Sequence, residues 1–281
     1  MNKVFQIGAF CFRIESDADI WIPENFLLFQ VNDHREIFYT YHLRVSERFP
    51  IPTGQLLAER PDLTVLETES GEKRFLSVRG RRVPYACYIE IGDREAEIIV
   101  HAREIQNLRI DTVFTSLFAL ERRMIQYESL ILHCAYMEYQ GKAVLFSAPS
   151  ETGKSTQADL WERYRGSRTI NGDRGLLRKI DGRWMACGWP VCGSSEICNL
   201  GDIPIHAIVM LEQGKENHVE RLSPFQAFAL LYGQITINQW NKQFVDDAIN
   251  LIEDLITGVP IWKLTCNISE DAVACLEEAL F

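Results

Sequence analysis

Residues 145–156 read LFSAPSETGKST and decide how the second half of this chain folds. The stretch fits the pattern G/A-x4-G-K-S/T, which begins at Ala148 and ends in Gly-Lys-Ser. A loop of this type exposes backbone N–H groups to a phosphate, while the Lys reaches the outer phosphates and the hydroxyl ligates Mg²⁺. The pattern therefore predicts a phosphate-binding loop made of Ser150, Glu151, Thr152, Gly153, Lys154, Ser155 and Thr156.

The segments on either side of this motif have the expected character. Residues 142–147, KAVLFS, form a short apolar run typical of a buried strand, and residues 157–164, QADLWERY, are typical of a helix. A strand before the loop and a helix after it are the context that a phosphate loop requires. We therefore expect the phosphates of a nucleotide to bind here with Mg²⁺, with Lys154 as an exposed loop residue that contributes little to packing.

A magnesium-dependent site needs a second acidic group, because Mg²⁺ takes oxygen ligands and a phosphate acceptor must be positioned or deprotonated. Asp173, which follows the apolar segment RTIN, is the best candidate. Ser155 and Asp173 are thus the predicted metal ligands. The alternative is a solvated turn aspartate, since Asn, Gly and Asp are common in turns. Asp181 is the second choice, but the following Gly182 indicates a hairpin.

The first part of the chain has a different periodicity. From Phe5 to about His101, apolar residues alternate with polar ones, and Gly92-Asp93 separates two such runs like a hairpin turn. Residues 112–127 change to a helical period, with Asp111 as a possible N-cap. These changes predict a strand-rich N-terminal domain over residues 1–110 and a nucleotide-binding domain over residues 111–281.

Turn and cap signals outline the rest of the second domain. Gln140-Gly141 and Asp181-Gly182 predict tight turns, the second placing antiparallel strands directly after Asp173. Ser223 followed by Pro224 predicts a helix start, and Gly258 closes an amphipathic helix. The predicted class is α/β (α+β) with a mixed sheet.

Composition limits the classes of partner. Lys and Arg total 29 against 39 Asp and Glu, and the formal charge of −10 argues against nucleic-acid binding. The longest apolar runs are too short for a membrane-spanning helix. Eight cysteines without a signal peptide indicate reduced thiols and a cytoplasmic protein. Cys187, Cys192 and Cys198 lack the C-x2-C spacing typical of zinc sites.

Two stretches together resemble a known family. Residues 132–161, LHCAYMEYQGKAVLFSAPSETGKSTQADLW, and residues 170–193, INGDRGLLRKIDGRWMACGWPVCG, resemble the HPr kinase/phosphorylase-like group, which is related to phosphoenolpyruvate carboxykinase. The resemblance covers roughly residues 130 to 200. His133, Lys154, Ser155 and Asp173 fall on that group's His, loop Lys, loop Ser and acidic positions.

This sequence departs from the family pattern at three places. Glu151 stands where the family loop often has Gly, and the usual acidic pair appears as Gly172-Asp173. The long signature for recognition of the carrier protein HPr is not visible, so HPr is not the expected substrate.

The resemblance implies an ATP-dependent phosphotransferase, an HPr kinase-like serine kinase that phosphorylates a serine-type hydroxyl of a protein, peptide or small molecule. It implies Asp173 as base or metal ligand, Lys154 as the group that neutralises the transferred phosphate, and His133 as a residue that orients the site. A packed strand histidine is the alternative for His133.

Two other functions remain open from the sequence. One is a nucleotide-binding regulatory or interaction protein without phosphoryl transfer, and the other is a phosphorylase or pyrophosphate-using enzyme. A homo-oligomer is possible, but the motif specifies no oligomeric state.

Overall fold

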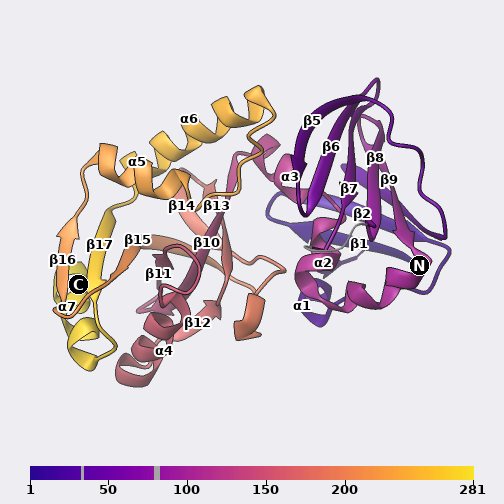
Figure 1. Ribbon diagram of the computed structural model, residues 1–281. Coiled ribbons are helices and arrows are strands. Elements are labelled where there is room, and N and C mark those ends of the chain that lie inside the picture. Colours follow the sequence, from indigo (N-terminus) through magenta and orange to yellow (C-terminus); the bar gives the residue numbers. More distant parts are fainter. Residues whose placement is uncertain (33–34, 79–82) are drawn as a thin grey trace. The chain divides into compact units, whose positions relative to one another are not determined.

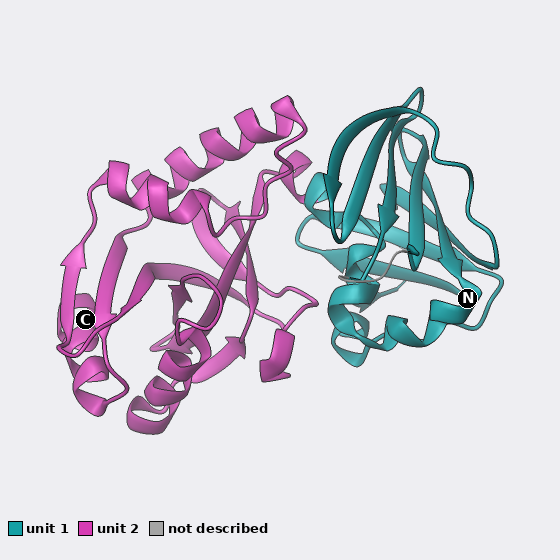
Figure 2. Ribbon diagram, viewed as in Figure 1, with its two compact units in different colours: residues 1–123 teal, residues 124–281 magenta. Residues whose placement is uncertain are grey.

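The computed structural model describes residues 1–32, 35–78 and 83–281 (Figure 1). The chain divides into two compact units, Met1–Arg123 and Met124–Phe281 (Figure 2). Each unit contains its own mixed sheet, so the expected mixed α/β architecture with a strand-rich first part is confirmed.

The sheet of the first unit has the strand order β3-β1-β2-β4-β9-β8-β7-β6-β5 within the described residues. Strand β4 pairs in parallel with both β2 and β9, and the other neighbours are antiparallel. The strands are β1 (Asn2–Ile7), β2 (Phe10–Ser16), β3 (Gln30–Val31), β4 (Tyr39–Ser46), β5 (Gln55–Arg60), β6 (Leu63–Thr68), β7 (Gly71–Leu76), β8 (Ala86–Gly92) and β9 (Glu95–His101). Helices α1 (Glu24–Leu27), η1 (Ala102–Arg109), α2 (Asp111–Ser116) and α3 (Leu120–Gln126) accompany them.

The segment expected as one helix over residues 112–127 is two helices, α2 and α3. The helical conformation is interrupted near Ala119, which has a φ of 47°. The N-cap of α2 is Ile110, and the expected cap residue Asp111 is already part of the helix. The division between the units falls after Arg123, beyond the boundary expected at residue 111. The physical reason is aromatic packing: the Phe114 ring lies 4.9 Å from Phe26, and Phe118 lies 5.1 Å from Tyr41.

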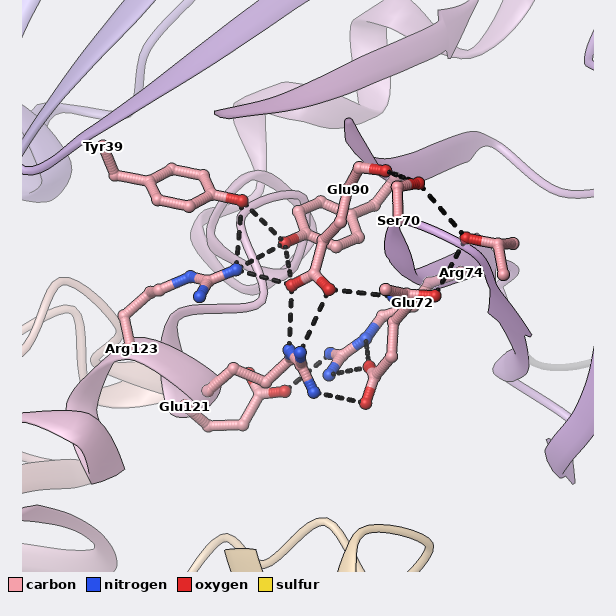
Figure 3. Close-up of polar contacts among 11 residues, drawn as sticks. Tyr39, Ser70, Glu72, Arg74, Glu90, Glu121 and Arg123 are labelled. Carbon is pink, nitrogen blue, oxygen red and sulfur yellow. Dashed lines mark hydrogen bonds and ion pairs between the residues drawn. The ribbon is translucent and has the colours of Figure 1, made fainter. Parts of the chain in front are cut away.

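A network of buried charges joins α3 to strands β7 and β8 of the first unit (Figure 3). Glu90 accepts hydrogen bonds from Arg123 at 2.5 Å and from Arg122 at 3.0 Å. Burial opposes the ionisation of Glu90, but Arg122, the backbone N–H of Glu72 and Arg123 hold its pKa below the usual range. The network comprises Glu72, Glu90, Glu121, Arg74, Arg122, Arg123, Tyr39 and Tyr88.

The sheet of the second unit has the order β11-β10-β13-β14-β15-β17-β16, with β12 paired to β10. An additional parallel pairing joins β11 to β15. The long strand β10 pairs with both β11 and β13, and the long strand β15 pairs with both β11 and β14. The strands are β10 (Ser129–Tyr139), β11 (Lys142–Ser147), β12 (Arg168–Asn171), β13 (Arg174–Ile180), β14 (Arg183–Cys187), β15 (Asp202–Gln213), β16 (His218–Arg221) and β17 (Ile261–Cys266).

Helices cover this sheet in two groups. The helices are α4 (Lys154–Arg165), η2 (Gly193–Ser195), α5 (Pro224–Tyr232), α6 (Lys242–Gly258) and α7 (Glu270–Leu280). Alternate residues of β10 and β11 pack with α5 and α6 in one apolar cluster, and the intervening residues pack with α4 and α7 in another. The second unit is therefore layered as helices, sheet and helices.

The tight turns and the helix start that the sequence predicts in the second unit are confirmed. Gln140 and Gly141 have positive φ values of 52° and 70° in the β10–β11 turn, and Asp181 and Gly182 have 51° and 78° in the β13–β14 turn. These angles suit the tight hairpin turns that such residue pairs favour. Ser223 caps α5 in a capping box with Gln226.

Two further observations concern membranes and thiols. Among the described residues, none of the helices combines the length and the apolar character needed to cross a bilayer. All eight cysteines are free thiols.

Candidate functional site

A cleft of about 370 Å³ lies in the second unit, between the start of α4 and the turn that precedes β13. It brings together every residue predicted for the site except Thr152. The lining residues are His133, Ser150, Glu151, Gly153, Lys154, Ser155, Thr156, Gly172, Asp173 and Ser194.

The motif loop, residues 148–153, connects β11 to α4 and presents the amino end of that helix to the cleft. Gly153 is the N-cap with a φ of 111°, a conformation that L-side chains rarely adopt. No side chain of the described residues caps the helix at this position. The first-turn N–H groups and the positive end of the helix dipole are thus available to an anion.

Lys154 is buried, with 7% of its surface exposed, which corrects the expectation of an exposed loop lysine. Its ammonium donates hydrogen bonds to the carbonyls of Ala148 and Pro149, both at 3.1 Å. These bonds hold the ammonium inside the curve of the loop. Burial lowers the pKa of Lys154, whereas the nearby charge of Asp173 acts in the opposite direction.

Asp173 lies among three basic side chains. Its Oδ1 is 3.6 Å from Nε2 of His133, and its Oδ2 is 3.2 Å from Nε of Arg174. Burial opposes ionisation, but the nearby His133 imidazole and the charges of Arg174 and Lys154 hold the pKa of Asp173 below its usual range. Asp173 is therefore ionised at neutral pH and is not the solvated turn aspartate that we considered as the alternative.

A fully buried asparagine fixes the position of Asp173. The Asn171 amide donates to the carbonyls of Trp189 and Val191, and its oxygen accepts from the backbone N–H groups of Asp173 and Arg174. All four distances lie between 2.9 and 3.0 Å. With both amide atoms satisfied, this side chain sets the direction of the turn after β12.

The hydroxyl of Ser155 points toward the same turn. Its Oγ donates to the Gly172 carbonyl at 3.3 Å, so the hydroxyl and the Asp173 carboxylate lie on adjoining parts of the cleft. A Cβ at Gly172 would meet Oγ of Ser195 at 2.1 Å, and only glycine fits there.

Glu151 and Thr152 form the outer part of the motif loop. Glu151 is exposed at the cleft and has a φ of 65°, a backbone conformation that favours glycine. The backbone carbonyls of both residues accept hydrogen bonds from Gln213. The Thr152 hydroxyl donates to the Pro149 carbonyl at 2.9 Å, and the side chain does not line the cleft.

The sequence did not reveal several residues of the site. Asn171 carried a signal, because a buried strand that ends in Asn-Gly-Asp suggests an amide-stabilised turn. No pattern in the sequence pointed to Ser194, because a complete hairpin separates it from Asp173 along the chain. Arg174 follows Asp173 directly in the sequence, but adjacency alone did not assign it to the site.

The oxygen donors of the cleft suit a hard cation such as Mg²⁺. The part of the chain described by the structure contains no group of three or more His, Cys, Asp or Glu side chains that could hold a metal ion. A magnesium ion at Ser155 and Asp173 therefore requires further oxygens from phosphate and water, which is how Mg²⁺ usually binds at phosphate-transfer sites.

Comparison with known proteins gives a family and similar solved structures. A family model described as SynChlorMet cassette protein ScmC matches residues 99–271. No curated protein matches the chain. The Hpr(Ser) kinase/phosphatase from Coxiella burnetii is 12% identical, and the match covers 53% of this chain and 91% of that chain with a TM-score of 0.31. A TM-score this low does not establish a common fold.

Proposed function

The chain belongs to the family described as SynChlorMet cassette protein ScmC, and we propose that it is an ATP-dependent kinase for a serine-type hydroxyl. The acceptor is a protein, a peptide or a small molecule. One observation carries the proposal: a single cleft collects the Lys154 ammonium, the Ser155 hydroxyl and the Asp173 carboxylate at an uncapped helix end. These are the groups that binding and transfer of a phosphoryl group require.

The motif loop binds the triphosphate in this proposal. The N–H groups at the start of α4 donate hydrogen bonds to phosphate oxygens, and Lys154 leaves its two carbonyl partners to neutralise the outer phosphate. Ser155 and Asp173 hold Mg²⁺, which when bound neutralises charge on the transferred group.

Asp173 positions the acceptor. Its ionised carboxylate accepts a hydrogen bond from the acceptor hydroxyl and receives the proton as the oxygen attacks phosphorus. His133 orients the carboxylate across the 3.6 Å contact, and Asn171 fixes the backbone beneath it. Because the pKa of Asp173 is low, its main contribution is orientation and electrostatics rather than strong basicity.

Calorimetry with MgATP tests the binding step. Lys154→Ala is expected to abolish measurable binding, whereas Lys242→Ala, which removes an exposed lysine, should bind like the wild type. Equal affinity of the Lys154→Ala variant would contradict the proposed phosphate site.

Incubation with γ-labelled ATP and a library of serine peptides tests the transfer step. Asp173→Asn should reduce the rate by roughly 10²-fold or more, because the neutral amide loses the charge that orients the acceptor hydroxyl and cannot receive its proton. Transfer that is unchanged in Asp173→Asn would show that the proposed mechanism is wrong.

Glu151 favours a second candidate, a nucleotide-binding regulatory protein without phosphoryl transfer. Its negative side chain is exposed at the cleft where phosphates would bind. Tight MgATP binding with no phosphorylated product by phosphorus NMR would support this function over the kinase.

A further inference from the structure

Besides Ser150 and Ser155 of the motif loop, a serine from outside that loop lines the cleft. Ser194 lies in the short helix η2, is exposed, and shares the cleft wall with Lys154 and Asp173. Within the part of the chain that the structure describes, its hydroxyl has no hydrogen-bond partner. It is the kind of group that the proposed reaction consumes.

Close packing keeps η2 beside the proposed base. Gly193 has a φ of 58°, and a Cβ built on it would lie 3.1 Å from Cβ of Asp173. A larger residue could not approach so closely without displacing Asp173. Ser194 follows directly, so its backbone is anchored next to the carboxylate.

The neighbouring serine is held in a different way. Oγ of Ser195 donates to the Cys192 carbonyl at 2.7 Å and accepts from the N–H of Ile197 at 3.3 Å. It also fills the space above Gly172. Of two adjacent serines, one is fixed by the loop and the other is free to react, which gives a matched internal control.

We propose that Ser194 is a site of autophosphorylation, modified by the cleft that it lines. This inference rests on the proposed kinase function. Oγ of Ser194 bonds to the γ-phosphorus of ATP, and the bond from that phosphorus to the bridging oxygen breaks. The electron pair of that bond leaves with ADP, and the hydroxyl proton passes to the Asp173 carboxylate.

Intact-mass spectrometry after incubation with MgATP tests the proposal. The wild type should gain one phosphoryl group, which peptide mapping should place at Ser194. Ser194→Ala should lose the modification, Ser194→Thr should retain it, and Ser195→Ala should still be modified at Ser194. The modified fraction should not change when the protein is diluted, because the transfer is intramolecular.

Separate measurements distinguish this proposal from the kinase function. A wild type that binds MgATP and phosphorylates an added serine peptide but stays unmodified would overturn the role of Ser194 alone. If Ser194→Ala gains as much phosphate as the wild type, Ser194 is not the site of autophosphorylation. If MgATP does not bind at all, the proposed function fails, and autophosphorylation fails with it.

Discussion

The two units of this protein each contain a cluster of charged side chains, and the clusters differ in how completely they are paired. In the first unit, three carboxylates and three guanidinium groups form ion pairs with one another beneath the surface (Figure 3). In the second unit, the ammonium of Lys154 donates to two loop carbonyls, and Asp173 opens onto a cleft. A closed network stabilises a fold, whereas a site with spare bonding capacity can accept a ligand.

Removing one member of the closed network should have the largest effect on stability. Arg123→Met leaves Glu90 and the hydroxyls of Tyr39 and Tyr88 without this donor. Breaking one side of a buried ion pair typically costs roughly 3–5 kcal/mol. Urea unfolding followed by a probe in the first unit should show that loss.

Arg44→Ala provides the control, because Arg44 pairs with Glu97 at the surface and 51% of its side chain is exposed. Exposed ion pairs contribute about 0–1 kcal/mol. Equal losses in the two variants would contradict the view that the network stabilises the first unit.

Asn171→Ala tests the support of the site in the second unit. The change leaves two buried carbonyls and two backbone N–H groups without their side-chain partner. We expect a loss of about 3 kcal/mol in unfolding free energy, together with slower phosphate transfer. Asn199→Ala, which removes one 3.3 Å bond to the Thr169 carbonyl, should change stability by less than about 1 kcal/mol.

Asp173→Asn should weaken the dependence of the unfolding free energy on pH in the acidic range. Because the pKa of Asp173 is lower in the folded state than in the unfolded chain, the carboxylate stabilises the fold above pH 4 or so, and this stabilisation is lost as the pH falls through the folded pKa. Urea midpoints measured across this acidic range should fall more steeply for the wild type than for Asp173→Asn. Asp181→Asn, in the hairpin turn, should behave like the wild type.

Glu151→Gly should have the smallest effect on stability. Glycine relieves the cost of a positive φ, about 1 kcal/mol, but it also adds flexibility to the unfolded chain. The thermal unfolding temperature should therefore change little. The same is expected for the control Gln140→Gly, because Gln140 also has a positive φ, of 52°. Only Glu151→Gly should bind MgATP more tightly, and equal affinities would show that Glu151 does not oppose phosphate binding.

Local signals in the sequence predicted much of the second unit. The turn pairs at Gln140-Gly141 and Asp181-Gly182, the cap at Ser223 and the strand-loop-helix order around Lys154 are all present. Each depends on a few adjacent residues, so the sequence alone contains the necessary information.

The boundary between the units and the break at Ala119 were not predictable in the same way. The helical period over residues 112–127 continues through the break, and only the packing of Phe114 and Phe118 among distant aromatic rings assigns this segment to the first unit. The burial of Lys154 also follows from the curled loop rather than from the motif letters.

By itself, the sequence determined that a loop with phosphate-binding character stands between a strand and a helix, and that an acidic residue precedes an antiparallel hairpin. The tertiary structure alone decided that this acid faces the loop, that Asn171 holds it there and that Ser194 reaches the same cleft. The reason is physical: spacing rules describe contacts within one element, whereas the cleft is built from β10, α4, η2 and the turn after β12, which only chain folding brings together.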